Sequence, residues 1–240
     1  MSDTPVITRR KPVAIAHRAG NDLGALRAAE EAGIDLLECD LWPYRGRIEV
    51  RHAKTFGRAP IPLLWDREGW RRWWLVPGWR PRLRVAELFA AQGEGSELML
   101  DLKGNDLGLP AAILGAREAT GRTGPLTVCS QNWDLLRPFL GRPGVAVVHS
   151  VGNIRQLRRL EAEADVTAVS IDRRLLTPAV AARLHARGCF VMTWSVSTWA
   201  EAEALLARGA DGIISSELDV LRRVMAVRAA REAPPSPAGG

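Results

Sequence analysis

The chain has 240 residues, of which 47% are hydrophobic, and it carries a formal net charge of +6. This length suits one large domain or two small ones, and the apolar content is ample for a core. The excess arginines are scattered, and no zinc-finger, RNA-recognition or basic-zipper pattern occurs, which favours a small anionic substrate or a lipid headgroup over nucleic acid.

The amino terminus, residues 1–11, is polar and basic, and nowhere in the chain is there a run of roughly 18 apolar residues that would span a bilayer. The three cysteines, Cys39, Cys129 and Cys189, each lie inside an apolar run, which is typical of core positions in a reducing compartment. We therefore expect a cytoplasmic protein without a disulfide framework; the oligomeric state is not indicated.

Apolar runs typical of buried strands alternate with amphipathic runs typical of helices. The first strand is predicted at Val13–His17, the first helix at Leu23–Ala32 and the second strand at Leu36–Trp42, followed by a short alternating run at Arg47–His52. Further strands are predicted at Leu98–Lys103, Leu126–Ser130, Val145–Ser150, Thr167–Ile171, Cys189–Val196 and Gly212–Ser215, and further helices at Val85–Gln92, Leu109–Thr120, Asn153–Glu163, Pro178–Arg187 and Thr198–Arg208.

About eight strand-helix units indicate a parallel sheet closed into a (β/α)₈ TIM barrel, with an open doubly wound sheet as the alternative. Polar residues at several strand ends, among them Ser130 and Ser215, favour the barrel, whose working residues lie at the carboxyl ends of its strands. The glycine-rich dinucleotide fingerprint is absent after the first strand, which removes support for a nicotinamide or flavin site.

Residues 64–84 interrupt the alternation of strands and helices with five tryptophans and six arginines, which indicates an insertion after the second strand. It is interpreted as a lid over the barrel mouth or, through residues 65–79, as a peripheral membrane contact. Residues 1–231 are predicted to form a single domain, and residues 232–240, rich in proline, glycine and alanine, a disordered tail.

Glu38 and Asp40 are two residues apart near the end of the second strand, so their side chains point to the same side. Two adjacent carboxylates in an apolar strand repel each other and lose hydration, and a hard divalent cation compensates for this. Asp101, at the end of another apolar strand, supplies a third oxygen ligand. The sequence therefore predicts a site for Mg²⁺ or Ca²⁺.

Two of the four histidines, His17 and His52, bracket this carboxylate pair in the sequence. Imidazoles beside a metal can supply the base and the acid for cleavage of a phosphoryl ester. Arg18 and Lys103 are candidates to hold the charge of the phosphate. Trp194 either fills the barrel or lines the alcohol side of the site.

This set of motifs resembles the glycerophosphodiester phosphodiesterase family. The resemblance covers Val13 to about Leu221 and is carried by His17-Arg18, Glu38-Cys39-Asp40, Val50-Arg51-His52, Asp101-Leu102-Lys103, the run at 191–196 and the run at 210–214. It implies a (β/α)₈ barrel, a divalent metal on Glu38, Asp40 and Asp101, catalytic His17 and His52, and cleavage of a glycerophosphodiester to glycerol 3-phosphate and an alcohol.

The chain also departs from the family pattern. Ala19 stands where a glycine usually follows His-Arg, Gly20-Asn21-Asp22 replaces a glutamate-asparagine-threonine triplet, and Ala53 replaces an aspartate. The Asp-Leu-Lys sequence is similar to sphingomyelinase D and phospholipase D toxins of the same superfamily. A phospholipase D-like activity on lysophospholipids or sphingolipids, and a catalytically degenerate barrel that binds a ligand, are therefore the alternatives to hydrolysis of small diesters.

Overall fold

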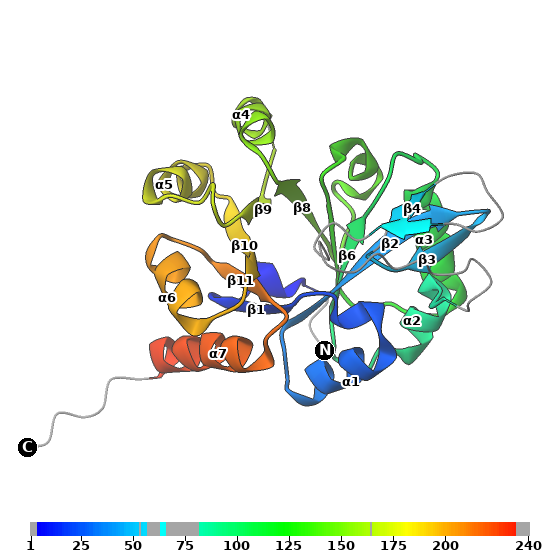
Figure 1. The fold of residues 1–240 in the computed structure, drawn as a ribbon, viewed down its shortest axis with the longest axis horizontal. Coiled ribbons are helices and arrows are strands. Elements are labelled where there is room, and N and C mark those ends of the chain that lie inside the picture. The colour runs from blue at the N-terminus through cyan, green and yellow to red at the C-terminus, as the bar shows by residue number, and fades with distance from the viewer. Residues whose placement is uncertain (1–3, 53, 57–62, 66–81, 164, 234–240) are drawn as a thin grey trace, which may run out of the picture.

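The computed structural model describes residues 4–52, 54–56, 63–65, 82–163 and 165–233. Eight parallel strands form a closed barrel around which the helices are arranged (Figure 1), because β1 pairs with both β2 and β11. In their order around the barrel, the strands are β1 (Val13–Ala16), β2 (Leu36–Tyr44), β6 (Leu98–Leu102), β7 (Leu126–Ser130), β8 (Val145–Val151), β9 (Ala168–Asp172), β10 (Phe190–Val196) and β11 (Gly212–Ser215). The predicted (β/α)₈ barrel is confirmed, and the open sheet is wrong.

The helices lie where the amphipathic runs predict them, with small differences at the ends. They are α1 (Leu23–Glu31), α2 (Val85–Ala91), α3 (Leu109–Ala119), α4 (Ile154–Ala162), α5 (Pro178–Ala186) and α6 (Trp199–Ala207). Side-chain caps fix several starts: Asp22 accepts from two amides of α1, and Thr177 and Thr198 cap α5 and α6. A last helix, α7 (Leu218–Glu232), was not among the predicted ones.

Two connections differ from the regular strand-helix unit. Between β7 and β8 the chain forms two short 3₁₀ turns, η3 (Trp133–Leu135) and η4 (Arg137–Phe139), instead of an α-helix. After β2 it returns as β3 (Arg47–Val50), which is antiparallel to β2 and lies within the alternating run at Arg47–His52. The loop after β1 contains η2 (Ala19–Asn21), a 3₁₀ turn beside the site.

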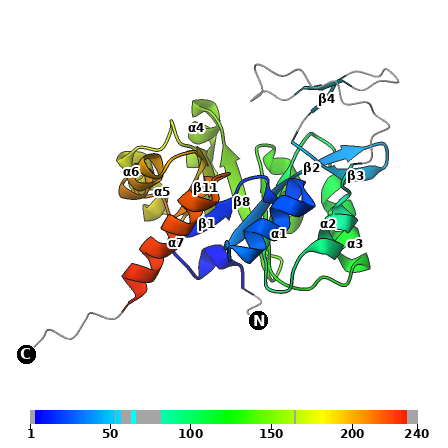
Figure 2. The same cartoon turned by 60° about the horizontal axis from the view of Figure 1, so that its bottom comes forward.

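A small sheet of β4 (Lys54–Phe56) and β5 (Leu63–Trp65) stands apart from the barrel near the β2–β3 hairpin (Figure 2). Most of the predicted insertion at 64–84 lies outside the described residues, and so do the lid and the membrane contact predicted from it. The predicted tail likewise falls outside them, apart from Glu232 at the end of α7 and Ala233.

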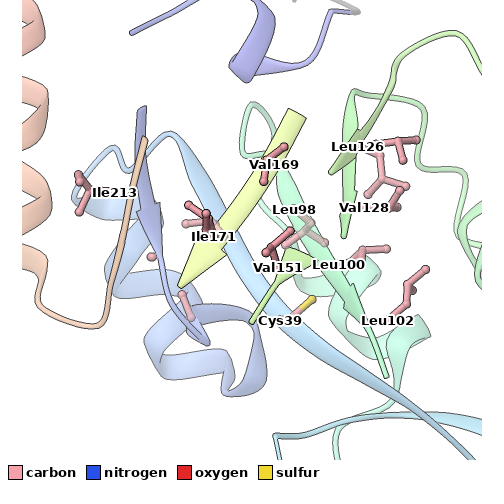
Figure 3. Packing of buried hydrophobic residues seen from close by; sticks show 14 of the residues in the cluster. Cys39, Leu98, Leu100, Leu102, Leu126, Val128, Val151, Val169, Ile171 and Ile213 are labelled. Carbon is pink, nitrogen blue, oxygen red and sulfur yellow. The ribbon is translucent and has the colours of Figure 1, made fainter. Parts of the chain in front are cut away.

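Alternation along the strands divides the apolar side chains into two layers. The outer layer lies between strands and helices and includes Leu98, Leu100 and Leu102 of β6 together with Cys39 of β2 (Figure 3). The inner layer fills the barrel and includes Met99 of β6. Because Asp101 follows Met99 by two residues, alternation turns it toward the barrel interior.

The amino-terminal segment closes the opposite end of the barrel. Val6 and Ile7, in η1 (Val6–Thr8), are buried in the inner layer with Val13 and Leu36. Residues 1–11 are therefore not simply a polar arm, because two of their apolar side chains belong to the core. Within the described part of the chain, no helix has the length and apolar character needed to cross a membrane.

Candidate active site

Three carboxylates meet at the carboxyl end of two neighbouring strands. Asp40 of β2 and Asp101 of β6 are register partners, and Glu38 lies two residues before Asp40 on the same face. One oxygen from each of the three side chains lies within 4.8 Å of the others. The predicted acidic cluster is thus assembled by strand register.

Lys103 partly neutralises this cluster. Its ammonium lies 2.8 Å from Asp40 Oδ1 and also contacts Asp101 Oδ2. Burial acts to raise the pKa of Asp40, but Lys103 and the hydrogen bond from His52 outweigh it and hold this pKa well below its usual range. The carboxylates in turn raise the pKa of Lys103 well above its ordinary value despite burial. Arg18 Nε lies farther away, 4.0 Å from Asp40 Oδ2.

The other two carboxyl groups are less well compensated. Burial, followed by repulsion from Asp40, raises the pKa of Glu38 well above its ordinary value, and burial is also the main cause of the raised pKa of Asp101. Among the described residues, the buried Asp101 Oδ1 has no hydrogen-bond partner. An acidic oxygen without a partner, in a buried cluster of three carboxyl groups, fits a divalent cation with oxygen ligands.

His52 is held on two sides. Its Nε2 lies 2.7 Å from a terminal nitrogen of Arg18, and its Nδ1 lies 3.2 Å from Asp40 Oδ2. Because a guanidinium can only donate, Nε2 accepts from Arg18, and the proton of the neutral ring lies on Nδ1 and points to Asp40. The arrangement therefore fixes the tautomer and the orientation of His52.

His17 follows β1 directly and faces the same cavity. Its backbone nitrogen donates to Ser215 O over 2.9 Å, which continues the pairing of β1 with β11, and its ring Nδ1 lies 3.2 Å from Ser216 Oγ. Both predicted catalytic histidines thus line the cavity that the carboxylates line.

Arg18 has a left-handed backbone conformation, with φ of 58°. This turn directs its amide nitrogen toward Glu38 Oε2, 2.6 Å away. Its guanidinium lies against His52 rather than in the lining of the cavity. The predicted phosphate contact of Arg18 would therefore require the side chain to leave His52.

Sequence reasoning missed Asn21 as a functional residue. Its side-chain amide donates to Asp40 Oδ2 over 2.7 Å, and its Oδ1 accepts from the backbone nitrogen of Asp40 over 2.8 Å. Asn21 could have been recognised from the sequence, because it is the one residue of the expected glutamate-asparagine-threonine triplet that this chain retains.

A small cavity of about 110 Å³ lies between these groups. The two histidines, the three carboxylates and Lys103 line one side of it. Trp194, Met99 and Ile214 contribute apolar surface, while Ser150 and Ser170 contribute hydroxyl groups. Trp194 thus borders the cavity, and it also packs against the inner layer of the barrel.

Two other polar residues near strand ends, Ser130 and His149, make contacts within the scaffold. Ser130 donates to Leu102 O over 2.7 Å and accepts from the amide of Asn132, so it fixes the β7 loop. His149 packs edge-on against Trp133, with ring centroids 5.3 Å apart, and it does not line the cavity.

No family model matches the chain, and no curated protein sequence is significantly similar to it. Solved structures do match over most of its length. A protein of Silicibacter pomeroyi assigned as a glycerophosphoryl diester phosphodiesterase aligns with a TM-score of 0.71 and 18% identity, covering 92% of this chain and 95% of that one.

Two further structures give the same result. A glycerophosphodiester phosphodiesterase of Parabacteroides distasonis aligns with a TM-score of 0.70 and 16% identity, covering 92% of this chain and 99% of that one. A phosphodiesterase of Oleispira antarctica, solved with the product sn-glycerol-3-phosphate, aligns with a TM-score of 0.67 and 20% identity, covering 90% of this chain and 96% of that one. The chain therefore has the fold of the solved glycerophosphodiester phosphodiesterases, as the sequence resemblance implies.

Proposed function

We propose that the protein is a metal-dependent phosphodiesterase that hydrolyses glycerophosphodiesters to glycerol 3-phosphate and an alcohol. The observation that carries the proposal is the convergence of three carboxylates and two histidines on one small cavity at the carboxyl end of the barrel. The shared fold supports it, and so does the product bound by the Oleispira antarctica enzyme.

Glu38, Asp40 and Asp101 would hold the divalent cation, Mg²⁺ or Ca²⁺. When bound, such a cation neutralises charge on the phosphate oxygens and so makes the phosphorus easier to attack. Lys103, already between Asp40 and Asp101, would bind a further phosphate oxygen, and Arg18 would do so after leaving His52.

The hydrogen bonds favour His52 as the base. Its Nε2 carries the lone pair, and Asp40 stabilises the charged ring that forms when Nε2 takes a proton from the attacking oxygen. His17, which also lines the cavity, then protonates the departing alkoxide. The attacking oxygen is either the neighbouring glycerol hydroxyl, which gives a cyclic ester first, or water, and chromatography of early reaction products distinguishes the two.

The test is release of glycerol 3-phosphate from a glycerophosphodiester, measured with and without a chelator. We expect activity that the chelator abolishes and an excess of Mg²⁺ or Ca²⁺ restores. His17→Ala and His52→Ala should each lower kcat by about 10²–10⁴-fold while metal affinity stays nearly the same. The control is His185→Ala, because His185 pairs with Asp211, outside the cavity. Full activity of the double variant H17A/H52A would refute the assignment.

One observation favours a second candidate, phospholipase D-like cleavage of lysophospholipids or sphingolipids. Asp101 and Lys103 contact each other within the cluster, and these are the residues that resemble the lipid-cleaving toxins. Release of choline from such lipids, rather than of glycerol 3-phosphate from small diesters, would support it. Binding of a diester without turnover would instead support a degenerate barrel that serves as a binding protein.

A lipid substrate would also require contact with a membrane surface. We keep the peripheral contact through residues 65–79 as a proposal from the sequence, because five tryptophans there alternate with arginines. Pelleting with anionic liposomes should then be lost in a Trp73→Ser, Trp74→Ser variant. Wild-type protein that stays in the supernatant would favour small diesters, which agrees with the cytoplasmic location expected from the cysteines.

A further inference from the structure

The wall of the cavity opposite the carboxylates is lined by hydroxyl and apolar groups instead of charged ones. Ser150 of β8 and Ser170 of β9 are register partners on neighbouring strands, and both line the cavity. They are 5% and 2% exposed, so they belong to the barrel interior rather than to its solvated rim. The two serines therefore lie side by side in the lining of the cavity of about 110 Å³ that Glu38, Asp40 and Asp101 also line.

The Ser170 hydroxyl has no hydrogen-bond partner within the described part of the chain, although its residue is 98% covered. Its oxygen is not among the fully buried atoms that lack a partner, so it is reached from the cavity that Ser170 lines. A hydroxyl in this position can donate to or accept from a polar group that enters the cavity.

The apolar residues around the serines restrict what this group belongs to. Trp194 presents an aromatic surface, and Met99 and Ile214 complete an uncharged lining on this side. Cationic and acidic side chains of the cavity lie on the other side, on and beside β1, β2 and β6. A short carbon chain bearing hydroxyl groups fits this wall, since its carbons contact the apolar surface while a hydroxyl reaches a serine.

We propose that Ser170, with Ser150 beside it, forms a hydroxyl-binding subsite that selects phosphoesters of a polyol such as glycerol over phosphoesters of a plain alkyl alcohol. The proposal rests on the proposed function for the position of the phosphate. It extends that function by naming the residues that recognise the glycerol part of the substrate. A site built to pair with a hydroxyl rejects an analogue that lacks one, because its own polar group is then left unpaired.

The experiment compares two ligands by isothermal titration calorimetry of the Mg²⁺-loaded protein. These are sn-glycerol 3-phosphate and propyl phosphate, which have the same number of carbons and the same phosphate group but differ in the two hydroxyls. Wild-type protein should bind glycerol 3-phosphate about tenfold more tightly. Ser170→Ala should reduce this ratio to about one by weakening glycerol 3-phosphate alone, with propyl phosphate affinity unchanged.

Ser170→Cys, which keeps the size but donates weakly, should give an intermediate ratio and covers the case in which the alanine variant fails to fold. The matched control is Thr193→Val. Thr193 is equally buried on β10, but its hydroxyl donates to Ile171 O over 2.9 Å, away from the cavity. This variant should keep the wild-type ratio.

Three outcomes overturn the subsite: no preference in wild-type protein, an unchanged preference in both Ser170 variants, or equal loss of affinity for both ligands. Binding of neither ligand by wild-type protein also overturns it. Failure of the proposed function looks different. A protein that binds glycerol 3-phosphate with the expected preference, yet hydrolyses no diester, would refute the activity and leave the subsite standing.

Discussion

Asn21 holds both the backbone and the side chain of Asp40, with two hydrogen bonds of 2.8 and 2.7 Å. Without Asn21, the Asp40 carboxylate would lose one of the contacts that orient it toward Glu38 and Asp101. We predict that Asn21→Ala weakens divalent metal affinity about tenfold, since one hydrogen bond to a charged group is worth roughly 1.5–3 kcal/mol. Terbium luminescence titration, which does not depend on turnover, measures this.

The control for Asn21 is another asparagine with a similar pair of contacts. Asn153 caps α4 by accepting from the amide of Gln156 and also donates to the Gln156 side chain. Asn153→Ala should cost about 1 kcal/mol of unfolding free energy without changing terbium affinity. Equal metal affinity in wild-type protein and in both variants would show that Asn21 does not position Asp40.

At the scale of residues, what could be predicted depended on local spacing. The carboxylates could be found because alternation in a strand places Glu38 and Asp40 on one face, whatever the rest of the chain does. The contact between Arg18 and His52 could not, because it joins two loops 34 residues apart and depends on the left-handed turn at Arg18. The partner of a flexible cationic side chain is set by tertiary structure.

Among the elements, the η2 turn carries a second prediction. It packs on β2 so closely that a Cβ at Gly20 would lie 2.6 Å from Cys39 Cβ. Gly20→Ala should therefore push η2 away from β2, lower the unfolding free energy by about 1–3 kcal/mol and displace Asn21 from Asp40. Denaturant unfolding and the terbium titration should both report the change.

The control for Gly20→Ala is Gly115→Ala, a substitution within a regular helix. Gly115 lies inside α3, and nothing lies within 4 Å of a Cβ built there. This variant should raise the unfolding free energy by about 0.5–1 kcal/mol. If Gly20→Ala were as stable as Gly115→Ala, the close packing of η2 on β2 would be wrong.

The amino-terminal turn η1 carries a prediction about pH. Val6 N donates to Glu97 Oε2 over 2.8 Å, and Thr127 donates to Oε1 over 2.7 Å. Burial raises the pKa of Glu97 above its ordinary value of 4.5, so the folded chain keeps a proton there that the unfolded chain has lost. The stability that this proton contributes is complete below the unfolded pKa and is lost as pH rises through the folded pKa.

Glu97→Gln cannot lose a proton and can keep both contacts, because the Thr127 hydroxyl can accept as well as donate. The unfolding free energy of this variant should therefore rise relative to wild type as pH increases from about 4 to about 7. Denaturant unfolding at a series of pH values measures the difference. A difference that is constant or falls over this range would contradict the raised pKa.

At the scale of the whole molecule, the barrel could be predicted because strand-helix alternation leaves few arrangements for eight parallel strands. The irregular connections could not. The 3₁₀ turns between β7 and β8 depend on packing of Trp133 and Phe139 in the core, which no periodicity shows. Helix α7 was missed because its hydrophobic face is interrupted by arginines, one of which, Arg228, is itself buried against Asp35.

Metal binding should stabilise the whole barrel, because the ligands come from β2 and β6 and are far apart in the unfolded chain. A cation at 100 times its Kd adds about 2.7 kcal/mol, which for a domain of this size raises Tm by about 5–10 °C. Differential scanning fluorimetry with Mg²⁺ or Ca²⁺, reversed by a chelator, measures this shift. Asp101→Asn removes the oxygen that lacks a partner and one charge of the cluster, so it should lose most of the shift. An equal shift in wild-type protein and in this variant would mean that the cation binds elsewhere.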